Sequence, residues 1–307
     1  MTDKATVEFA IDVVAIVSCQ DIFRNGKPFE DRSQGQARSI FGGHLLGQSV
    51  SAAQQTLPST FDVHSVQSTF LRPGHSSIDV EYHVERIMDG RTLASRLVRA
   101  KQGGAVIYVA TIGFQRHADQ LDQVATVLRY EAPMPDWAKM TEPDDKSLTS
   151  THDLLVIDTG FPKDLVGAFV NPFDWFHLPI ERRQDPTEVC ARSFLRSTPL
   201  STDNSAVHLA SFAWLSDVFL IYTANWANPN KFPLGMAGVS IETTVNHSVW
   251  FHLPSARIDN WLACERKTSW GADGRVLIQQ SLWNKADGQL VMTCVQEALL
   301  RLKRANL

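Results

Sequence analysis

The sequence has little net charge, few cysteines and no long run of basic residues. Lysine and arginine together number 29 against 33 aspartates and glutamates, which gives a formal net charge of −4. Nucleic-acid binding needs a basic surface, so this composition argues against a nucleic-acid partner. The four cysteines lie far apart, without the paired spacing of a zinc site, and we expect reduced thiols of an intracellular protein. They are Cys19, Cys190, Cys264 and Cys294.

The sequence also gives no sign of a secretory signal or a membrane span. Met1-Thr2-Asp3-Lys4 leads into a short apolar run that Asp12 interrupts, so no signal peptide is expected. Residues 205–226 have the length of a membrane helix, but Asp217 stands at their middle and basic flanks are absent. A charge at the centre of a bilayer is costly, so we expect a buried helix there.

Asp217 is the first candidate for chemistry. Between Asn204 and Asn230 it alone carries a formal charge, and its neighbours are mostly apolar. A buried carboxylate is costly unless a partner compensates it. Proteins keep such groups mainly where their chemistry is used. A structural aspartate that caps a helix or binds backbone would give the same pattern.

Turn signals and strand-like runs divide the chain into two similar halves. In each half, a helical segment precedes a meander of strands whose tight turns contain Asp-Gly or Gly-Gly. In the first half we predict a helix over 41–55 and strands over 63–74, 78–88, 92–102 and 105–114. In the second half, a helix around Asp217 precedes strands over 239–251, 256–268, 275–284 and 289–302. A further strand is expected within residues 168–198.

The two halves repeat at nearly one sequence offset. Pro73 and Pro254 are 181 residues apart, and Gly104 and Gly288 are 184 apart, which indicates a duplication. A helix followed by an antiparallel meander, used twice, predicts an α+β fold of two units, each a helix wrapped by a sheet. We place the N-terminal unit at 1–116, a polar acidic connector at 117–163, and the C-terminal unit, with the catalytic residues, at 164–307.

Five segments carry a family resemblance. They are Phe41-Gly42-Gly43-His44-Leu45-Leu46-Gly47-Gln48, Val63-His64-Ser65, Phe70-Leu71-Arg72-Pro73-Gly74, Asn246-His247-Ser248-Val249-Trp250-Phe251-His252 and Val295-Gln296-Glu297. In this order they resemble the acyl-CoA thioesterase II family, over nearly the whole chain except the connector. The resemblance implies a double hotdog fold and the hydrolysis of acyl-CoA, as in the bacterial and peroxisomal members of that family.

The resemblance also implies a catalytic set in the second unit. It assigns the aspartate, the hydroxyl and the amide of that set to Asp217, Thr244 and Gln296. It further suggests His64, in the first unit, as an accessory residue. The chain departs from many relatives at Asn246, where they often have aspartate; because Asp217 is present, we expect no effect on catalysis.

The residues themselves leave alternatives open. Gln296 is the one amide on an apolar strand face. A structural glutamine that bridges two strands would give the same sequence pattern as a catalytic one. Thr244 alternates with Asn246 on the polar face of its strand, so either that face lines a cleft or a bulge rotates the residue. His64 lies on a half-apolar face that is typical of a core histidine. His44, an accessory candidate with the neighbouring Gly43, can cap, pack or line the site.

A thioester suits such a site, because a thiolate leaves readily and one activated water is enough. We expect burial to raise the pKa of Asp217 toward neutrality, so that it acts as a general base on a water held by Thr244 and Gln296. Backbone N–H groups at the glycine-rich start of the first helix, and the Gln296 amide, are candidate donors to the oxyanion.

Other chemistries find little support. Gly47-Gln48-Ser49-Val50-Ser51 lacks the closing glycine of a nucleophile elbow, and no His, Glu or Cys cluster has metal spacing. We therefore predict neither a cofactor nor a metal. The phosphates of CoA call for basic side chains at the mouth of the site, for which Arg32, Arg38 and Arg72 are candidates.

The leading hypothesis is hydrolysis of fatty acyl-CoA in the peroxisome matrix. The C-terminal Ala305-Asn306-Leu307 resembles a relaxed Ser-Lys-Leu address that the peroxisomal import receptor reads, although an ordinary polar terminus in a cytoplasmic protein is the alternative. Exposed sheet edges favour a homodimer or a higher homo-oligomer.

Two other functions compete with hydrolysis. A hotdog enoyl-CoA hydratase pairs an aspartate and a histidine in one short motif, for which Asp174-Trp175-Phe176-His177 has the wrong spacing. A non-catalytic acyl-CoA-binding protein would have no need to keep Asp217, Thr244 and Gln296 together.

Overall fold

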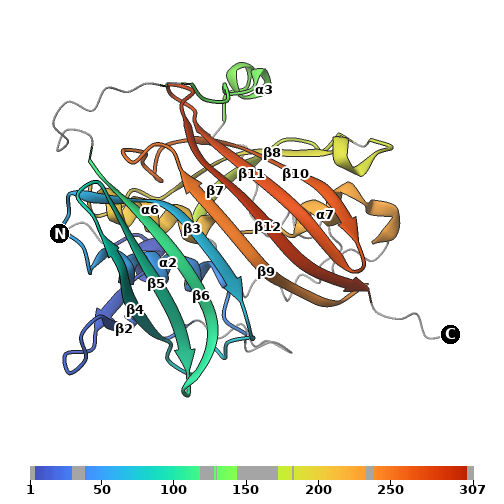
Figure 1. Ribbon diagram of the computed structural model, residues 1–307. Coiled ribbons are helices and arrows are strands. Elements are labelled where there is room, and N and C mark those ends of the chain that lie inside the picture. Colours follow the sequence, from blue (N-terminus) through green and yellow to red (C-terminus); the bar gives the residue numbers. More distant parts are fainter. Residues whose placement is uncertain are drawn as a thin grey trace.

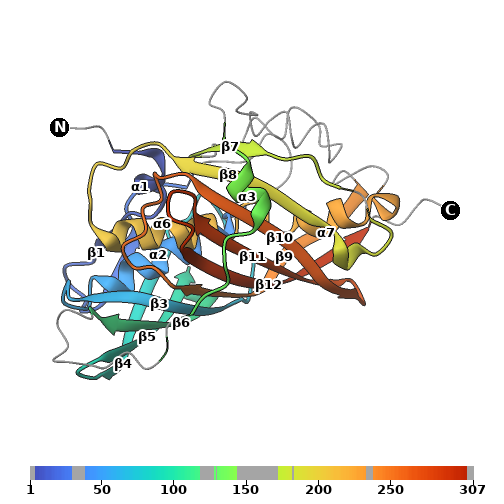
Figure 2. The ribbon, with the colours of Figure 1, turned by 90° about the horizontal axis from the view of Figure 1, so that it is seen from above.

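The computed structural model describes residues 4–29, 39–117, 128, 130–143, 172–181, 183–232 and 238–302. Within these residues, twelve strands form one continuous antiparallel sheet in the order β1-β2-β4-β5-β6-β3-β9-β12-β11-β10-β8-β7. The sheet curves around helices α2 and α6, which lie side by side on its inner face (Figure 1, Figure 2).

The N-terminal half contains the predicted helix and four-strand meander. Three further elements, α1, β1 and β2, precede them and were not predicted. The bounds are α1 Thr6–Ala10, β1 Val13–Ala15, β2 Ile22–Asn25, α2 Gly42–Gln54, β3 Phe61–Phe70, β4 Glu81–Asp89, β5 Leu93–Gln102 and β6 Ala105–Arg116.

The C-terminal half repeats the helix and the meander. Its bounds are β7 Phe173–His177, η3 Pro186–Glu188, β8 Cys190–Ser197, α6 Ser205–Leu215, α7 Tyr222–Ala227, η4 Pro229–Lys231, β9 Val239–Phe251, β10 Leu262–Ala272, β11 Arg275–Asn284 and β12 Leu290–Leu302. None of the helices described has both the length and the hydropathy that crossing a bilayer requires.

The predicted helix around Asp217 is wrong in one respect, because the helix ends before that residue. The last residue of α6 is Leu215, and the Ser216 hydroxyl donates to the carbonyl oxygen of Ala213 at 2.7 Å. Phe219 has a left-handed φ of 55°, which no helix residue adopts, so the chain turns before α7 begins at Tyr222. Asp217 therefore lies in the turn between the two helices.

The two halves join through the pairing of β3 with β9. Ser68 lies opposite His247, and the two strands form the centre of the continuous sheet. Both strands also carry a bulge at equivalent places, with His64 extra in β3 and Val245 extra in β9. These bulges are 181 residues apart, the offset already seen between the two prolines. The duplication therefore extends to irregularities of the strands.

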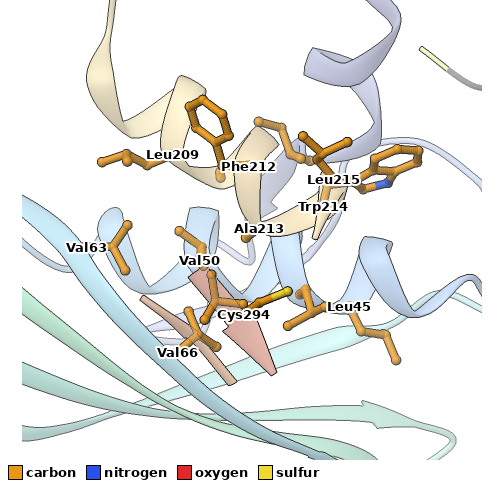
Figure 3. Close-up of a cluster of buried hydrophobic side chains, with 14 of the residues drawn as sticks. Leu45, Val50, Val63, Val66, Leu209, Phe212, Ala213, Trp214, Leu215 and Cys294 are labelled. Carbon is orange, nitrogen blue, oxygen red and sulfur yellow. The ribbon is translucent and has the colours of Figure 1, made fainter. Parts of the chain in front are cut away.

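The core lies between the two helices and the inner face of the sheet. Glycines at the helix contact allow a close approach: a methyl group on Gly43 would lie 2.6 Å from the carbonyl oxygen of Trp214. One on Gly47 would lie 3.1 Å from that of Ala210. Figure 3 shows apolar side chains of α2, α6, β3 and β12 that meet here, each adding about 1.5–3 kcal/mol by burial when it is as large as valine or leucine. Those labelled are Leu45, Val50, Val63, Val66, Leu209, Phe212, Ala213, Trp214, Leu215 and Cys294.

The described part of the connector packs on the outer face of the second half. It contains α3, Asp136–Met140, whose Ala138 is fully buried against a small cluster that includes Phe194 and Trp283. The Trp137 indole N–H donates to Glu265 at 3.0 Å. Residues 118–127, 129 and 144–163 of the connector lie outside the described residues.

Candidate active site

Three of the predicted residues meet in one buried cluster. The Gln296 amide nitrogen donates to Asp217 Oδ1 at 2.6 Å and to Thr244 Oγ1 at 2.9 Å. The Thr244 hydroxyl also lies within donating distance of Asp217 Oδ1, at 3.1 Å. Asp217 is 9% exposed and Gln296 is 1% exposed. The carboxylate is thus held by polar side chains in the interior, and the catalytic roles of the three residues stay predictions.

The bulge in β9 brings Thr244 into this cluster. Glu297 of β12 pairs with Asn246, but the next residue, Ala298, pairs with Thr244, so Val245 is extra. Without it, Thr244 would share the outward face of Asn246, because side chains alternate along a strand. The bulge turns the hydroxyl to the inner face, beside Gln296. Of the two readings of Thr244 that the sequence leaves open, the bulge is correct.

His247, for which no role was predicted, completes the cluster. It is fully buried, its Nε2 lies 2.8 Å from the Ser216 hydroxyl, and its Nδ1 lies 3.3 Å from the Gln296 nitrogen. Because the Ser216 hydroxyl donates its proton to Ala213, it accepts from His247, and Nε2 carries the ring proton. Nδ1 is then an acceptor, and its 3.3 Å contact is the longest of the three that share the two N–H groups of the Gln296 nitrogen.

Burial lowers the pKa of His247 to about 3, so the imidazole is neutral at physiological pH. A neutral ring with its proton on Nε2 fixes the orientation of the Gln296 amide, with its nitrogen toward Asp217. The alternation of residues along β9 could have predicted the burial of His247. It shares the inner face of that strand with Val249 and Phe251, which are both buried.

The start of α2 closes the site on the other side. A methyl group on Gly42 would lie 2.5 Å from Asp217 Oδ2 and 3.0 Å from the Phe70 ring. Only glycine therefore allows the carboxylate to approach the first turn of the helix this closely. The N–H groups of a first turn have no partner within the helix and carry partial positive charge, which favours an ionised carboxylate or an oxyanion nearby.

The structure does not bring His64 into contact with the cluster. It is the bulged residue of β3, and its ring lies against Gly113 of β6. Ser68, which pairs with His247, is four residues further along the strand, or about 13 Å. Burial lowers the pKa of His64. An accessory role for His64 stays a prediction that this geometry does not support.

His44 and Gly43 belong to the contact between the two helices. His44 Nδ1 lies 3.1 Å from the carbonyl oxygen of Ala10, and the ring packs edge-on against Phe41 and Trp214. Gly43 lies against the backbone of Trp214. Both residues position α2, and through it Gly42, beside Asp217.

Two family models match the chain. A family model described as the acyl-CoA thioesterase C-terminal domain matches residues 138–300, and one described as the acyl-CoA thioesterase N-terminal domain matches residues 29–115. The chain belongs to the acyl-CoA thioesterase family. The resemblance seen in the sequence and the enzyme class it implies, thioester hydrolase, are confirmed.

The alignments with similar proteins extend over nearly the whole chain. Acyl-coenzyme A thioesterase 8 of Mus musculus is 27% identical over 294 residues, 92% of this chain and 86% of its own. Acyl-CoA thioesterase 2 of Haemophilus influenzae is 28% identical over 280 residues, 86% of this chain and 88% of its own. The crystal structure of acyl-CoA thioesterase II TesB2 from Mycobacterium marinum superposes with a TM-score of 0.73 at 22% identity, covering 98% and 99% of the two chains. The predicted double hotdog fold is confirmed.

The hydratase alternative finds no matching geometry in this thioesterase chain. Asp174 and His177 are three residues apart on β7, so their side chains point to opposite faces of the sheet. Asp174 pairs with Arg196 at 3.4 Å, and His177 stacks on Trp175. These two side chains therefore form no aspartate–histidine pair.

Of the three arginines proposed for the CoA phosphates, Arg32 and Arg38 lie outside the described residues. Arg72 is exposed just after β3, two residues from Phe70, whose ring borders Gly42. It stays a candidate for phosphate binding.

Proposed function

We propose that this chain hydrolyses fatty acyl-CoA to the free fatty acid and CoA, with Asp217 as the general base. The observation that carries this proposal is the buried contact of the Asp217 carboxylate with the Gln296 amide and the Thr244 hydroxyl. Membership of the acyl-CoA thioesterase family supports the reaction and the substrate class.

In the proposed mechanism a water molecule, oriented by Thr244 and Gln296, attacks the thioester carbonyl. As the O–C bond forms, Asp217 accepts a proton from the water, and N–H groups at the start of α2 stabilise the oxyanion. Collapse of the intermediate breaks the C–S bond, and the proton passes from Asp217 to the departing thiolate. The buried Gln296 Oε1, which has no donor among the described residues, is available to accept a hydrogen bond from the water.

The test is thiol release from dodecanoyl-CoA by the purified protein. We predict that Asp217→Asn lowers kcat by at least about 100-fold, the usual loss on removal of a general base. The matched control is Asp273→Asn, in the turn between β10 and β11, where φ is 53° and asparagine is well tolerated. A folded Asp217→Asn variant with nearly wild-type turnover would disprove the role of Asp217. A wild-type protein that binds acyl-CoA without releasing thiol would favour the non-catalytic alternative.

We further propose that the enzyme acts in the peroxisome matrix, because Ala305-Asn306-Leu307 resembles the address that the import receptor reads. An N-terminal fluorescent fusion of the full chain should then co-localise with a peroxisomal marker, and removal of these three residues should leave it in the cytoplasm. Equal distribution of both fusions would refute the address.

A homodimer or higher homo-oligomer is also proposed, since the edge strands β1 and β7 leave backbone groups for pairing. Light scattering after size exclusion measures the mass directly, and a mass of one chain, 34.2 kDa, would contradict this proposal.

A further inference from the structure

A buried arginine in the second unit has no anionic partner among the residues that the structure describes. Arg266 of β10 is 2% exposed, yet no carboxylate among the described residues lies within ion-pair distance of it. Its Nε donates to Gln280 Oε1 at 2.5 Å, and its guanidinium lies 5.1 Å from the centre of the Trp175 ring. Its Nη2 is buried without a hydrogen-bond partner in the described part of the chain. An uncompensated buried charge is costly, so this arrangement needs an explanation.

The first unit shows what a structural buried arginine looks like. Arg96 of β5 is 0% exposed, and it donates to the Asp89 carboxylate at 2.5 Å and to the Thr56 hydroxyl at 2.7 Å. It also donates to the carbonyl oxygens of Met88 and Ser95. Arg96 is thus paired with an anion and well supplied with acceptors, whereas Arg266 has an amide and an aromatic ring.

Two more unpartnered polar groups stand beside Arg266. The Trp175 ring stacks on His177, with ring centres 5.2 Å apart, and the Trp175 Nε1 and His177 Nε2 atoms are both buried without a partner among the described residues. Burial and the charge of Arg266 lower the pKa of His177 to about 3, so the ring is neutral. The guanidinium and the indole are donors only, and the imidazole can donate from Nε2, so the group matches an acceptor such as a carboxylate.

These groups lie on the same inner sheet face as the catalytic cluster. Gln280 connects them: its nitrogen lies 3.8 Å from Cys294 Sγ, and Cys294 is two residues from Gln296 on β12. From the strand register, the backbone of Arg266 is two strands and two residues from that of Gln296, roughly 12 Å. Phe219, two residues after Asp217, packs near Trp175 with ring centres 6.1 Å apart. The turn that carries the predicted base therefore also borders Trp175, the ring against which the Arg266 guanidinium lies.

We propose that Arg266, Trp175 and His177 form a subsite for the far end of the acyl chain and receive the terminal carboxylate of an ω-carboxyacyl-CoA. This inference rests on the proposed function, since the thioester must lie at Asp217. The backbones of Arg266 and Gln296 are separated by roughly 12 Å, a length that an extended chain of about ten carbons spans at about 1.25 Å per carbon for C–C bonds near 1.5 Å. The terminal carboxylate would supply the missing charge partner.

The element that covers this region is the short helix α7. It packs against β10, β11 and β8, and its Thr223 Oγ1 and Asn225 Nδ2 are buried without partners among the described residues. No side chain caps its first turn. If an acyl chain enters between α7 and the sheet, only oxygen atoms such as those of its terminal carboxylate can accept hydrogen bonds from these polar atoms, because its methylenes cannot.

The experiment compares matched pairs of substrates, octanoyl-CoA with the mono-CoA thioester of suberic acid, and decanoyl-CoA with that of sebacic acid. The wild-type protein should show kcat/KM at least about 10-fold higher for the ω-carboxy member, as expected of a charged hydrogen bond. Arg266→Met should remove this advantage while activity on octanoyl-CoA and decanoyl-CoA is kept or increased. Lys267→Met is the matched control, because it removes the same charge from the next residue of β10, which is exposed.

Two further measurements protect the test from misfolding. Trp175→Phe keeps an aromatic ring but removes the indole N–H together with the five-membered ring, and it should reduce the ω-carboxy advantage partially. Sebacate should raise the Tm of the wild-type protein but not that of Arg266→Met, a readout that is independent of turnover. Hydrolysis of monocarboxylic substrates without an ω-carboxy preference would overturn this inference alone. Failure to hydrolyse any acyl-CoA, with a normal Tm response to sebacate, would overturn the proposed function alone.

Discussion

At the scale of single residues, the orientation of one amide decides the electrostatics of the site. With the Gln296 nitrogen toward Asp217, the carboxylate receives a hydrogen bond at 2.6 Å; with the oxygen there, two acceptors would face each other. His247 favours the first arrangement, because its Nδ1 accepts from the same nitrogen and its Nε2 is held by Ser216. A buried neutral histidine thereby positions a group that touches the predicted base.

We predict that His247→Leu lowers kcat roughly 10- to 100-fold with little change in KM, because small misplacements of positioned groups have effects of this size. His252→Leu is the matched control: His252 directly follows the same strand, β9, but lies outside the cluster, where it contacts Thr293. Long-range 1H–15N NMR should show the proton of His247 on Nε2 in the wild-type protein. Unchanged kcat in His247→Leu, or a proton on Nδ1, would contradict this role.

At the scale of elements, the start of α2 and the turn after α6 make the site between them. Neither element holds the chemistry alone, since Gly42 begins one and Asp217 follows the other. Gly43 and Gly47 set how closely α2 approaches α6, and so fix the distance between the helix start and the carboxylate.

Gly42→Ala tests this arrangement. The added methyl group would lie 2.5 Å from Asp217 Oδ2, so the carboxylate must shift, and we expect kcat to fall by about 100-fold. Helix propensity alone would make alanine the more stabilising residue, so the loss of activity should not be matched by a large loss of Tm. Gly271→Ala is the control, because its methyl group would meet Val276 at an ordinary 3.5 Å. Equal kcat in the two variants would refute the close approach.

At the scale of the whole molecule, one continuous sheet encloses both units and buries several histidines. His177 and His247 each have a pKa lowered to about 3 by burial, against an ordinary value of 6.5. The unfolded chain therefore binds more protons than the folded one between about pH 3 and 6.5. Their contribution to stability is complete above about pH 6.5 and is lost as the pH falls through that range.

We therefore expect the free energy of unfolding to decrease by roughly 1.4 kcal/mol per pH unit for each of these histidines below about pH 6. Urea unfolding at pH 7 and pH 5 measures the difference. In His177→Leu the free energy of unfolding should decrease less between pH 7 and pH 5, by the amount that one buried histidine contributes. A wild-type protein whose stability is the same at pH 5 and pH 7 would disprove the prediction.

Local sequence pattern was sufficient for the order of the elements and for part of the site. Turn residues such as Asp273-Gly274 and the period of apolar residues mark each hairpin, because they act within a few neighbours. The same period placed Gln296 on the buried face of β12, where the structure has it. The apolar surroundings of Asp217 likewise predicted its burial.

Contacts between distant strands decided the rest. The face of Thr244 depends on a bulge against β12, the role of His247 depends on which side chains lie beside it, and His64 is displaced by the register of β3. The end of α6 before Asp217 follows from turns that no propensity marked. Whether Arg266 has a counterion is likewise a property of the assembled sheet, because its neighbours come from β7 and β11. The alternation of residues along a strand determines which face of the sheet a side chain occupies. Only the packing of distant strands and helices determines which groups that side chain contacts.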